Sequence, residues 1–71
     1  MAFLPPLLPG CMIAWFDESS DRPHYALVVT SSSDPGRAGW FDATIIQEMR
    51  VKKLTLWWGD KGTRWRVLHG A

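Results

Sequence analysis

The stretch of residues 52–68, KKLTLWWGDKGTRWRVL, consists of two runs of alternating apolar and polar residues joined by a glycine-containing turn. Alternation with a period of two is the pattern of a β-strand that buries one face. Two such runs around a short turn are typical of a β-hairpin. We therefore predict strands over residues 52–58 and 63–68, paired through a turn at residues 59–62. The predicted inward side chains are Leu54, Leu56, Trp58, Trp65 and Val67, and the outward ones are Lys53, Thr55, Trp57, Arg64 and Arg66.

Three further runs of strand-forming residues precede this stretch, at residues 11–16 (CMIAWF), 25–30 (YALVVT) and 40–46 (WFDATII). The second run is apolar on both faces, which indicates a central strand. Residues 17–23 and 31–39 are rich in turn-forming residues and are expected to be loops, with residues 47–50 as a connection or one helical turn. Five short strands predict an all-β fold. Curling into a small five-stranded, partly open barrel would remove most of the free sheet edge.

The chain has 71 residues, which is enough for one small domain of marginal stability. Cys11 is the only cysteine, so no disulfide can form within the chain. Cys11, His24 and His69 cannot supply the dense four-ligand set of a structural zinc site. Stability is therefore expected from an apolar core or from oligomerisation, and 46% apolar residues with five tryptophans suit both. The side chains that we expect to be largely buried are Val28, Leu56, Trp58 and Val67.

The first ten residues, MAFLPPLLPG, form an uncharged, extended arm before the predicted barrel domain of residues 11–69. Its prolines restrict the unfolded chain and remove backbone donors, so the arm suits an extended strap better than a sheet strand. We expect the strap to pack on another chain by burying Phe3, Leu4, Leu7 and Leu8. The competing expectation is that the arm folds back and plugs the open end of its own barrel.

Charge is distributed unevenly along the chain. Residues 1–49 carry two basic and six acidic groups, a net charge of −4, whereas residues 50–71 carry six basic groups and one acidic group, a net charge of +5. Such a division with near-zero total charge fits head-to-tail contact between like subunits.

The basic half also contains Trp57, Trp58 and Trp65. Aromatic rings beside Arg and Lys are typical of anchors in protein interfaces and of single-stranded nucleic-acid sites, while a third interpretation is an ordinary solvated face. The partner-binding residues predicted here are Trp57, Arg64 and Arg66. The nucleic-acid alternative uses Lys52, Lys53, Trp57, Arg64 and Arg66.

No arrangement of residues predicts catalysis. Asp17, Glu18 and Asp21 lie in a polar loop, where nothing separates the pKa values of two carboxyl groups as acid–base catalysis requires. Cys11 lies in an apolar run without a base motif, and a free cysteine there is typically a small buried hydrophobe. We therefore predict a protein that is not an enzyme and has no catalytic residues, no metal and no cofactor.

The N-terminal residues do not resemble a signal peptide, because they lack a positive n-region and three prolines interrupt the apolar run. No run reaches the roughly 18 apolar residues of a transmembrane helix. We expect this chain, which begins at Met1, to be a complete small gene product that is made in a reducing cytoplasm and binds no membrane.

The order of these segments resembles that of small barrels of the Src-homology-3 type. Pro9-Gly10 precedes the first strand, Ala26-Leu27-Val28-Val29 belongs to the second, and a Gly/Ser-rich segment follows. Near the C-terminus, residues 54–60 (LTLWWGD) combine an apolar strand with a Gly-Asp turn, and residues 65–68 (WRVL) form a short last strand.

Over residues 9–69 the chain is similar to short barrel proteins that tailed bacteriophages encode among their structural genes. This resemblance implies a non-enzymatic structural protein that docks on a larger symmetric assembly, such as a phage capsid or tail. Its partners would be copies of itself or a larger virion protein, and its location the virion or the host cytoplasm. The alternative is a nucleic-acid-binding small barrel that uses the basic, aromatic C-terminal hairpin.

Overall fold

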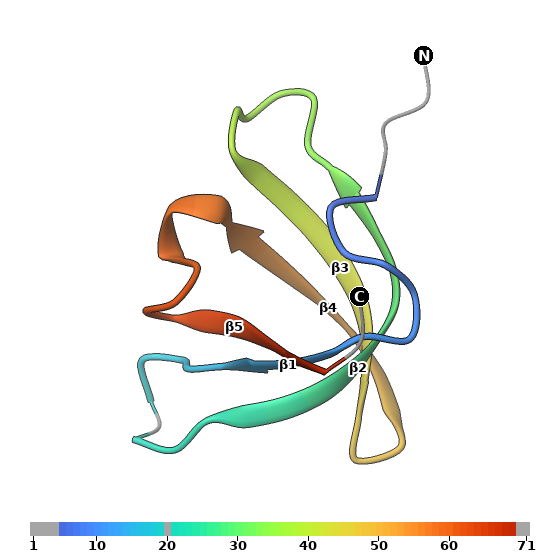
Figure 1. Ribbon diagram of the computed structural model, residues 1–71, viewed down its shortest axis with the longest axis vertical. Helices are drawn as coiled ribbons and strands as arrows, with labels where there is room; N and C mark the ends of the chain where they lie inside the picture. Colours follow the sequence, from blue (N-terminus) through green and yellow to red (C-terminus); the bar gives the residue numbers. More distant parts are fainter. Residues whose placement is uncertain (1–4, 20, 70–71) are drawn as a thin grey trace.

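The computed structural model describes residues 5–19 and 21–69. Within these residues, five strands form one antiparallel sheet in the order β4-β3-β2-β1-β5 (Figure 1). The elements are β1 (Met12–Trp15), β2 (His24–Ser33), β3 (Trp40–Gln47), β4 (Arg50–Trp57), the short 3₁₀ helix η1 (Trp58–Asp60) and β5 (Trp65–His69). The all-β prediction is confirmed. The sheet is strongly curved but not closed into a barrel, since no ladder joins β4 to β5 in the described part of the chain.

Strand β2 lies at the centre of the sheet, as its apolar faces predicted. Its first residues pair with β1, and its later residues pair with β3. The register with β3 shifts between Val28 and Thr30, which leaves Val29 as an extra residue. Such a β-bulge bends a strand and increases its twist, so it contributes to the curvature of the sheet. Residues 31–33, which were expected in a loop, instead continue β2 and pair with β3.

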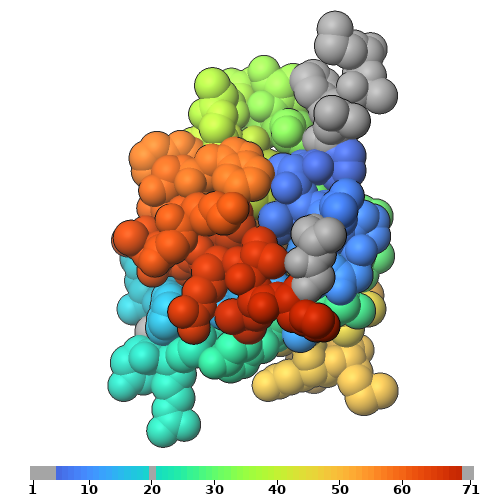
Figure 2. Space-filling model, viewed as in Figure 1, coloured from blue at the N-terminus to red at the C-terminus, as the bar shows by residue number. Residues whose placement is uncertain are grey.

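The turn between β3 and β4 is the tightest in the molecule. Gln47 pairs with Arg50, so the loop contains only Glu48 and Met49, and both have positive φ, 51° and 64°. Two positive φ angles in a two-residue hairpin define a type I′ turn, whose twist matches that of the flanking strands. Figure 2 shows this hairpin, in yellow, projecting from the lower end of the molecule.

Replacing Met49 with Gly is expected to stabilise the protein. The left-handed conformation costs a residue with a Cβ about 1–2 kcal/mol, and the gain is partly offset by the greater freedom of glycine in the unfolded chain. We expect the free energy of unfolding to rise by about 1 kcal/mol, and the melting temperature by about 4–8 °C. Thermal unfolding followed by circular dichroism at low protein concentration measures this change. Met49→Ala is the matched control, because Met49 is 96% exposed and Ala keeps the Cβ; an equal gain for M49A would refute the backbone explanation.

The predicted hairpin of residues 52–68 is wrong in its pairing. Strand β4 pairs with β3, whereas β5 pairs with β1 on the other side of the sheet. The intervening segment turns through η1 and carries the chain across the open end of the curved sheet (Figure 1). Gly59 makes this turn feasible, because a Cβ there would lie 2.5 Å from the Trp57 ring. The alternation identified the two strands and, apart from Trp58, their inner faces, but it contains no information on the partner strand.

The core fills the concave face of the sheet. Its central side chains are Ile13, Val28, Phe41, Ile45 and Trp65, each at most 2% exposed. Val28 and Leu56 are buried as predicted, while Val67 is half-buried and packs against the core. The prediction for Trp58 is wrong: it starts η1 rather than ending a strand, and it remains 38% exposed. Cys11 is 1% exposed, as expected of a small buried hydrophobe.

The arm folds back on its own chain at Leu7. The Leu7 side chain is 5% exposed and belongs to the core. Its backbone N–H donates to Ser31 Oγ at 2.9 Å, and the Ser31 hydroxyl donates to the Leu7 carbonyl at 2.8 Å. We expected Leu7 to pack on another chain. Instead, its side chain is already buried in the core of its own chain, which removes it from water. Leu8 is 48% exposed, and Phe3 and Leu4 lie outside the described residues.

Candidate binding cleft

The curvature of the sheet brings the end of β4 close to the start of β5. At this point Trp65 Nε1 donates a hydrogen bond to the Trp57 carbonyl at 2.8 Å. Beside this contact lies a cleft of about 280 Å³, bounded by β4 on one side and by the ends of β1 and β5 on the other. Its aromatic walls are formed by Trp15, Phe16, Trp40, Trp57 and Trp65, and its charged groups are Asp17, Asp60 and Arg64.

Trp57 is held in place by its neighbours. Its ring stacks on Trp40 across the β3–β4 pair, with ring centres 6.2 Å apart and planes inclined by 23°. Gly39 and Gly59 lie against the ring, where an added Cβ would approach it to 3.1 and 2.5 Å. The guanidinium of Arg37 lies 4.6 Å from the centre of the Trp40 ring. Trp57 therefore presents a fixed ring that is still 42% exposed.

Arg64 is the basic group of the cleft. Its backbone N–H donates to the Asp60 carbonyl at 2.8 Å, which fixes the start of β5. Its guanidinium lies 4.0 Å from the carboxylate of Glu18 in the loop after β1, and its side chain is 59% exposed. The mouth of the cleft thus combines one cation with carboxylates, and an exposed ion pair of this kind contributes little to stability.

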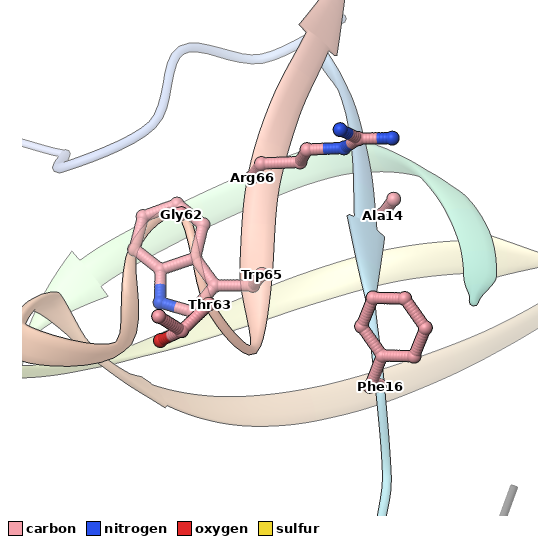
Figure 3. Close-up of a pocket in the computed structure, with 6 residues that line it drawn as sticks. All are labelled: Ala14, Phe16, Gly62, Thr63, Trp65 and Arg66. Atoms are coloured by element: carbon pink, nitrogen blue, oxygen red, sulfur yellow. The ribbon is translucent and has the colours of Figure 1, made fainter. Parts of the chain in front are cut away.

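Arg66 lies outside this cleft. It lines a separate hollow of about 130 Å³ with Ala14, Phe16, Gly62, Thr63 and Trp65. Figure 3 shows Arg66, Ala14 and Phe16 projecting to one side of β1 and β5, with the Trp65 ring on the other side. Phe16 and Trp65 therefore border both hollows, while the two arginines that the sequence grouped together belong to different ones.

A series of hydrogen-bonded polar side chains lies near the start of β4, beside the β3–β4 turn. Lys52 Nζ donates to Gln47 Oε1 at 3.2 Å, and Gln47 Nε2 lies 3.3 Å from His24 Nδ1. The other ring nitrogen of His24, Nε2, lies 3.0 Å from Asp17 Oδ2. A hydrogen bond from the Ser19 hydroxyl, supported by His24, lowers the pKa of Asp17. These residues border a hollow of about 250 Å³ that shares Trp15, Asp17 and Leu54 with the aromatic cleft.

Comparisons with family models, with curated proteins and with solved structures find no match for this chain.

No helix in the described part is long and apolar enough to cross a membrane. Within residues 5–19 and 21–69, no group of three or more His, Cys, Asp or Glu side chains could hold a metal ion. Burial raises the pKa of the Cys11 thiol. The cleft, with aromatic walls and a charged mouth, is suited to binding.

The structure divides the predicted binding residues among several places. Trp57 and Arg64 come together in the aromatic cleft. Lys52 is bonded to Gln47, Lys53 lies on the outer face of β4, and Arg66 lies on the outer face of β5. The five residues of the nucleic-acid alternative therefore do not border a single hollow.

Sequence reasoning missed the cleft residues of the acidic half, Trp15, Phe16 and Trp40. For Trp40 a signal was present. A two-residue turn at residues 48–49 places residue 40 opposite residue 57, so the turn alone would have paired Trp40 with Trp57. Trp15 and Phe16 reach the cleft only through the β1–β5 pairing, for which the sequence contained no signal.

Proposed function

We propose that this protein is a non-enzymatic structural protein that docks, through the aromatic cleft, on a larger symmetric assembly such as the capsid or tail of a bacteriophage. The observation that carries the proposal is the meeting of Trp57, at the end of edge strand β4, and Arg64, directly before edge strand β5, in one cleft with four further aromatic walls. Trp, Tyr and Arg are the residues that most often dominate binding energy at protein interfaces. A fixed, half-exposed ring also loses little conformational freedom on binding.

The arrangement of elements supports the proposed likeness to Src-homology-3-type small barrels. Pro9-Gly10 precedes β1, and Gly59-Asp60 lies in the turn before a short last strand. That strand returns to the side of β1, so the curved sheet remains partly open at the cleft. On this proposal the open side is where the partner docks, and the protein acts in the virion or in the host cytoplasm.

The charges of the cleft favour a protein partner over nucleic acid. Arg64 is accompanied by Glu18 at 4.0 Å, and Asp17 and Asp60 also line the cleft. These carboxylates repel a phosphate backbone, whereas a protein segment can offer groups of both signs. A small nucleic-acid-binding barrel remains the second candidate, favoured by the exposed Trp57 and by Lys53 on the same face of β4.

Replacing Arg64 with Glu is expected to prevent docking while the protein stays folded, because Arg64 is exposed and its backbone makes the structural contact. The measurement is mass spectrometry of particles purified from the native host, with the fold of each variant checked by circular dichroism. We expect the wild-type chain in the particles and at least about a tenfold loss for R64E and W57A, as for an interface anchor worth more than about 1.4 kcal/mol.

Lys53→Glu is the matched control, since it makes the same charge change outside the cleft. K53E is expected to enter particles normally. If nucleic acid were the ligand, K53E and R64E would both weaken binding of a single-stranded oligonucleotide, and wild-type binding would fall steeply between about 50 and 200 mM salt. Absence of the wild-type chain from purified particles, or normal incorporation of folded R64E, would contradict the proposal.

A further inference from the structure

Strand β4 is an edge of the sheet, and its outer side pairs with no other strand in the described part of the chain. Successive residues of an antiparallel strand direct their backbone groups alternately toward the partner strand and away from it. Directly after β4, the Trp58 N–H points toward β3, since it donates to the Gly39 carbonyl at 2.8 Å. The Trp57 carbonyl points away and accepts from Trp65 Nε1. Counted back in twos from Trp57, the residues whose backbone groups face the free edge are Val51, Lys53 and Thr55.

A groove follows this free edge on the inner side of the sheet. The aromatic cleft of about 280 Å³ and the hollow of about 250 Å³ share Trp15, Asp17 and Leu54, so they adjoin along β4. Lys52 borders the groove at one end and Trp57 at the other. These two positions are about 16–17 Å apart along a strand, the length of about five or six extended residues.

Lys52 provides the groove with a cation that has donors to spare. Its ammonium group donates to Gln47 Oε1 at 3.2 Å and forms no ion pair with a carboxylate of the described residues. Asp17, which lines the same hollow, is instead bonded to Ser19 and His24. Because an ammonium group has three donors, two remain for a ligand. The groove therefore fits a carboxylate at this end and an apolar side chain among the aromatic rings at the other.

We propose that the docking partner inserts an extended segment into this groove, where it adds to β4 as a sixth strand of the sheet. The backbone of the segment bonds to the free N–H and carbonyl groups of Val51, Lys53 and Thr55. A carboxylate of the segment binds Lys52, and an apolar side chain packs against Trp57. In strand addition, main-chain bonds supply affinity and side-chain pockets supply specificity. This inference rests on the proposed docking function and specifies how the partner is recognised.

Other occupants fit this edge less well. Two β4 strands of separate copies would bring together the Arg50, Lys52 and Lys53 side chains of both, and lysines on an edge strand commonly prevent such pairing. The N-terminal arm of another copy is unsuited, because its prolines lack backbone donors. Nucleic acid has no peptide backbone with which to extend a sheet. An acidic, extended segment of a different protein matches both the edge and the groove.

Amide hydrogen exchange, measured residue by residue on the free chain and on the chain in particles purified from the native host, tests the strand addition. In the free chain the amides of Lys52 and Leu54, which face β3, are expected to be protected, whereas those of Val51, Lys53 and Thr55 exchange readily. In particles these last three are expected to exchange at least about tenfold more slowly. Unchanged exchange overturns the proposal. So does protection that appears in the free chain as its concentration rises, since a second copy would then be the occupant.

Two pairs of variants separate the backbone contact from the charge contact. Lys53→Pro removes an N–H from the free edge and none from the ladder with β3, a position where an edge strand tolerates proline. K53P is expected to lower incorporation into particles at least about fivefold, because it leaves a carbonyl of the partner unpaired. Its control, K53A, keeps the N–H and is expected to enter normally. Lys52→Glu is expected to cause a similar loss by placing two carboxylates together, whereas K53E makes the same change outside the groove.

The outcomes distinguish failure of strand addition from failure of docking. If folded K53P and K52E enter particles normally while R64E and W57A are lost, the cleft docks a partner without adding a strand, and only the strand addition is overturned. Absence of the wild-type chain from particles overturns both. Circular dichroism checks the fold of each variant. Should K53P not fold, hydrogen exchange decides, because it uses the wild-type chain.

Discussion

Replacing Trp65 with Ala is expected to lower the free energy of unfolding by about 3–5 kcal/mol, the usual cost of truncating a buried tryptophan. Trp65 is 2% exposed and is the largest fully buried side chain. Its ring lies 5.4 Å from Phe41 and 5.2 Å from Trp58, both in edge contacts. A small domain has a total stability near the lower end of about 5–15 kcal/mol, so W65A is expected to keep no more than about 2 kcal/mol and to unfold at low urea concentration.

Urea unfolding followed by circular dichroism measures this loss, and two variants separate its causes. Trp65→Phe keeps an aromatic ring but removes Nε1, which leaves the Trp57 carbonyl without this donor. It is expected to cost about 1–3 kcal/mol. Trp58→Ala removes the exposed member of the aromatic cluster and is expected to cost less than W65A, because Trp58 is 38% exposed. A greater loss for W58A than for W65A would show that the cluster is not centred on Trp65.

The position of Trp65 also shows what the sequence could predict. Alternation placed Trp65 and Val67 inward and Arg64 and Arg66 outward, and the structure agrees for Trp65 and, in part, for Val67. This assignment holds whether β5 pairs with β4 or with β1, so it could not reveal that the hairpin was wrong. The pairing depends on the curvature of β2 and on η1, which carries the chain across the open end of the sheet.

The candidate cleft, too, was only partly predictable from the sequence. Trp57 and Arg64 were identified because they are near each other in a basic, aromatic segment. The other walls come from residues 15, 16 and 40, and their approach depends on long-range pairing rather than on local pattern. The outer face of the sheet shows the reverse case. The sequence showed that residues 25–30 are apolar on both faces, but only the register reveals that Leu27, Ile46 and Val51 adjoin.

Replacing Leu7 with Ala is expected to lower the free energy of unfolding of the isolated chain by about 2–5 kcal/mol, as for other large-to-small core changes. Leu7 reaches the core from outside the sheet, and its backbone is held through Ser31 by two hydrogen bonds of 2.8 and 2.9 Å. Ser31→Ala removes both and is expected to cost about 1–3 kcal/mol. Thermal and urea unfolding at low protein concentration measure both losses, so that self-association does not contribute.

Leu8→Ala is the matched control, because the neighbouring side chain is 48% exposed and its truncation is expected to change stability by no more than about 0.5 kcal/mol. A chain beginning at Pro9 removes Leu7 altogether and is expected to melt at a markedly lower temperature as an isolated monomer. If the N-terminal arm packed only on a partner chain, the opposite pattern would be expected. L7A and the shortened chain would then melt like wild type, and only assembly would be lost. The two hydrogen bonds to Ser31 argue against that outcome, because they order the backbone at Leu7 before any partner binds.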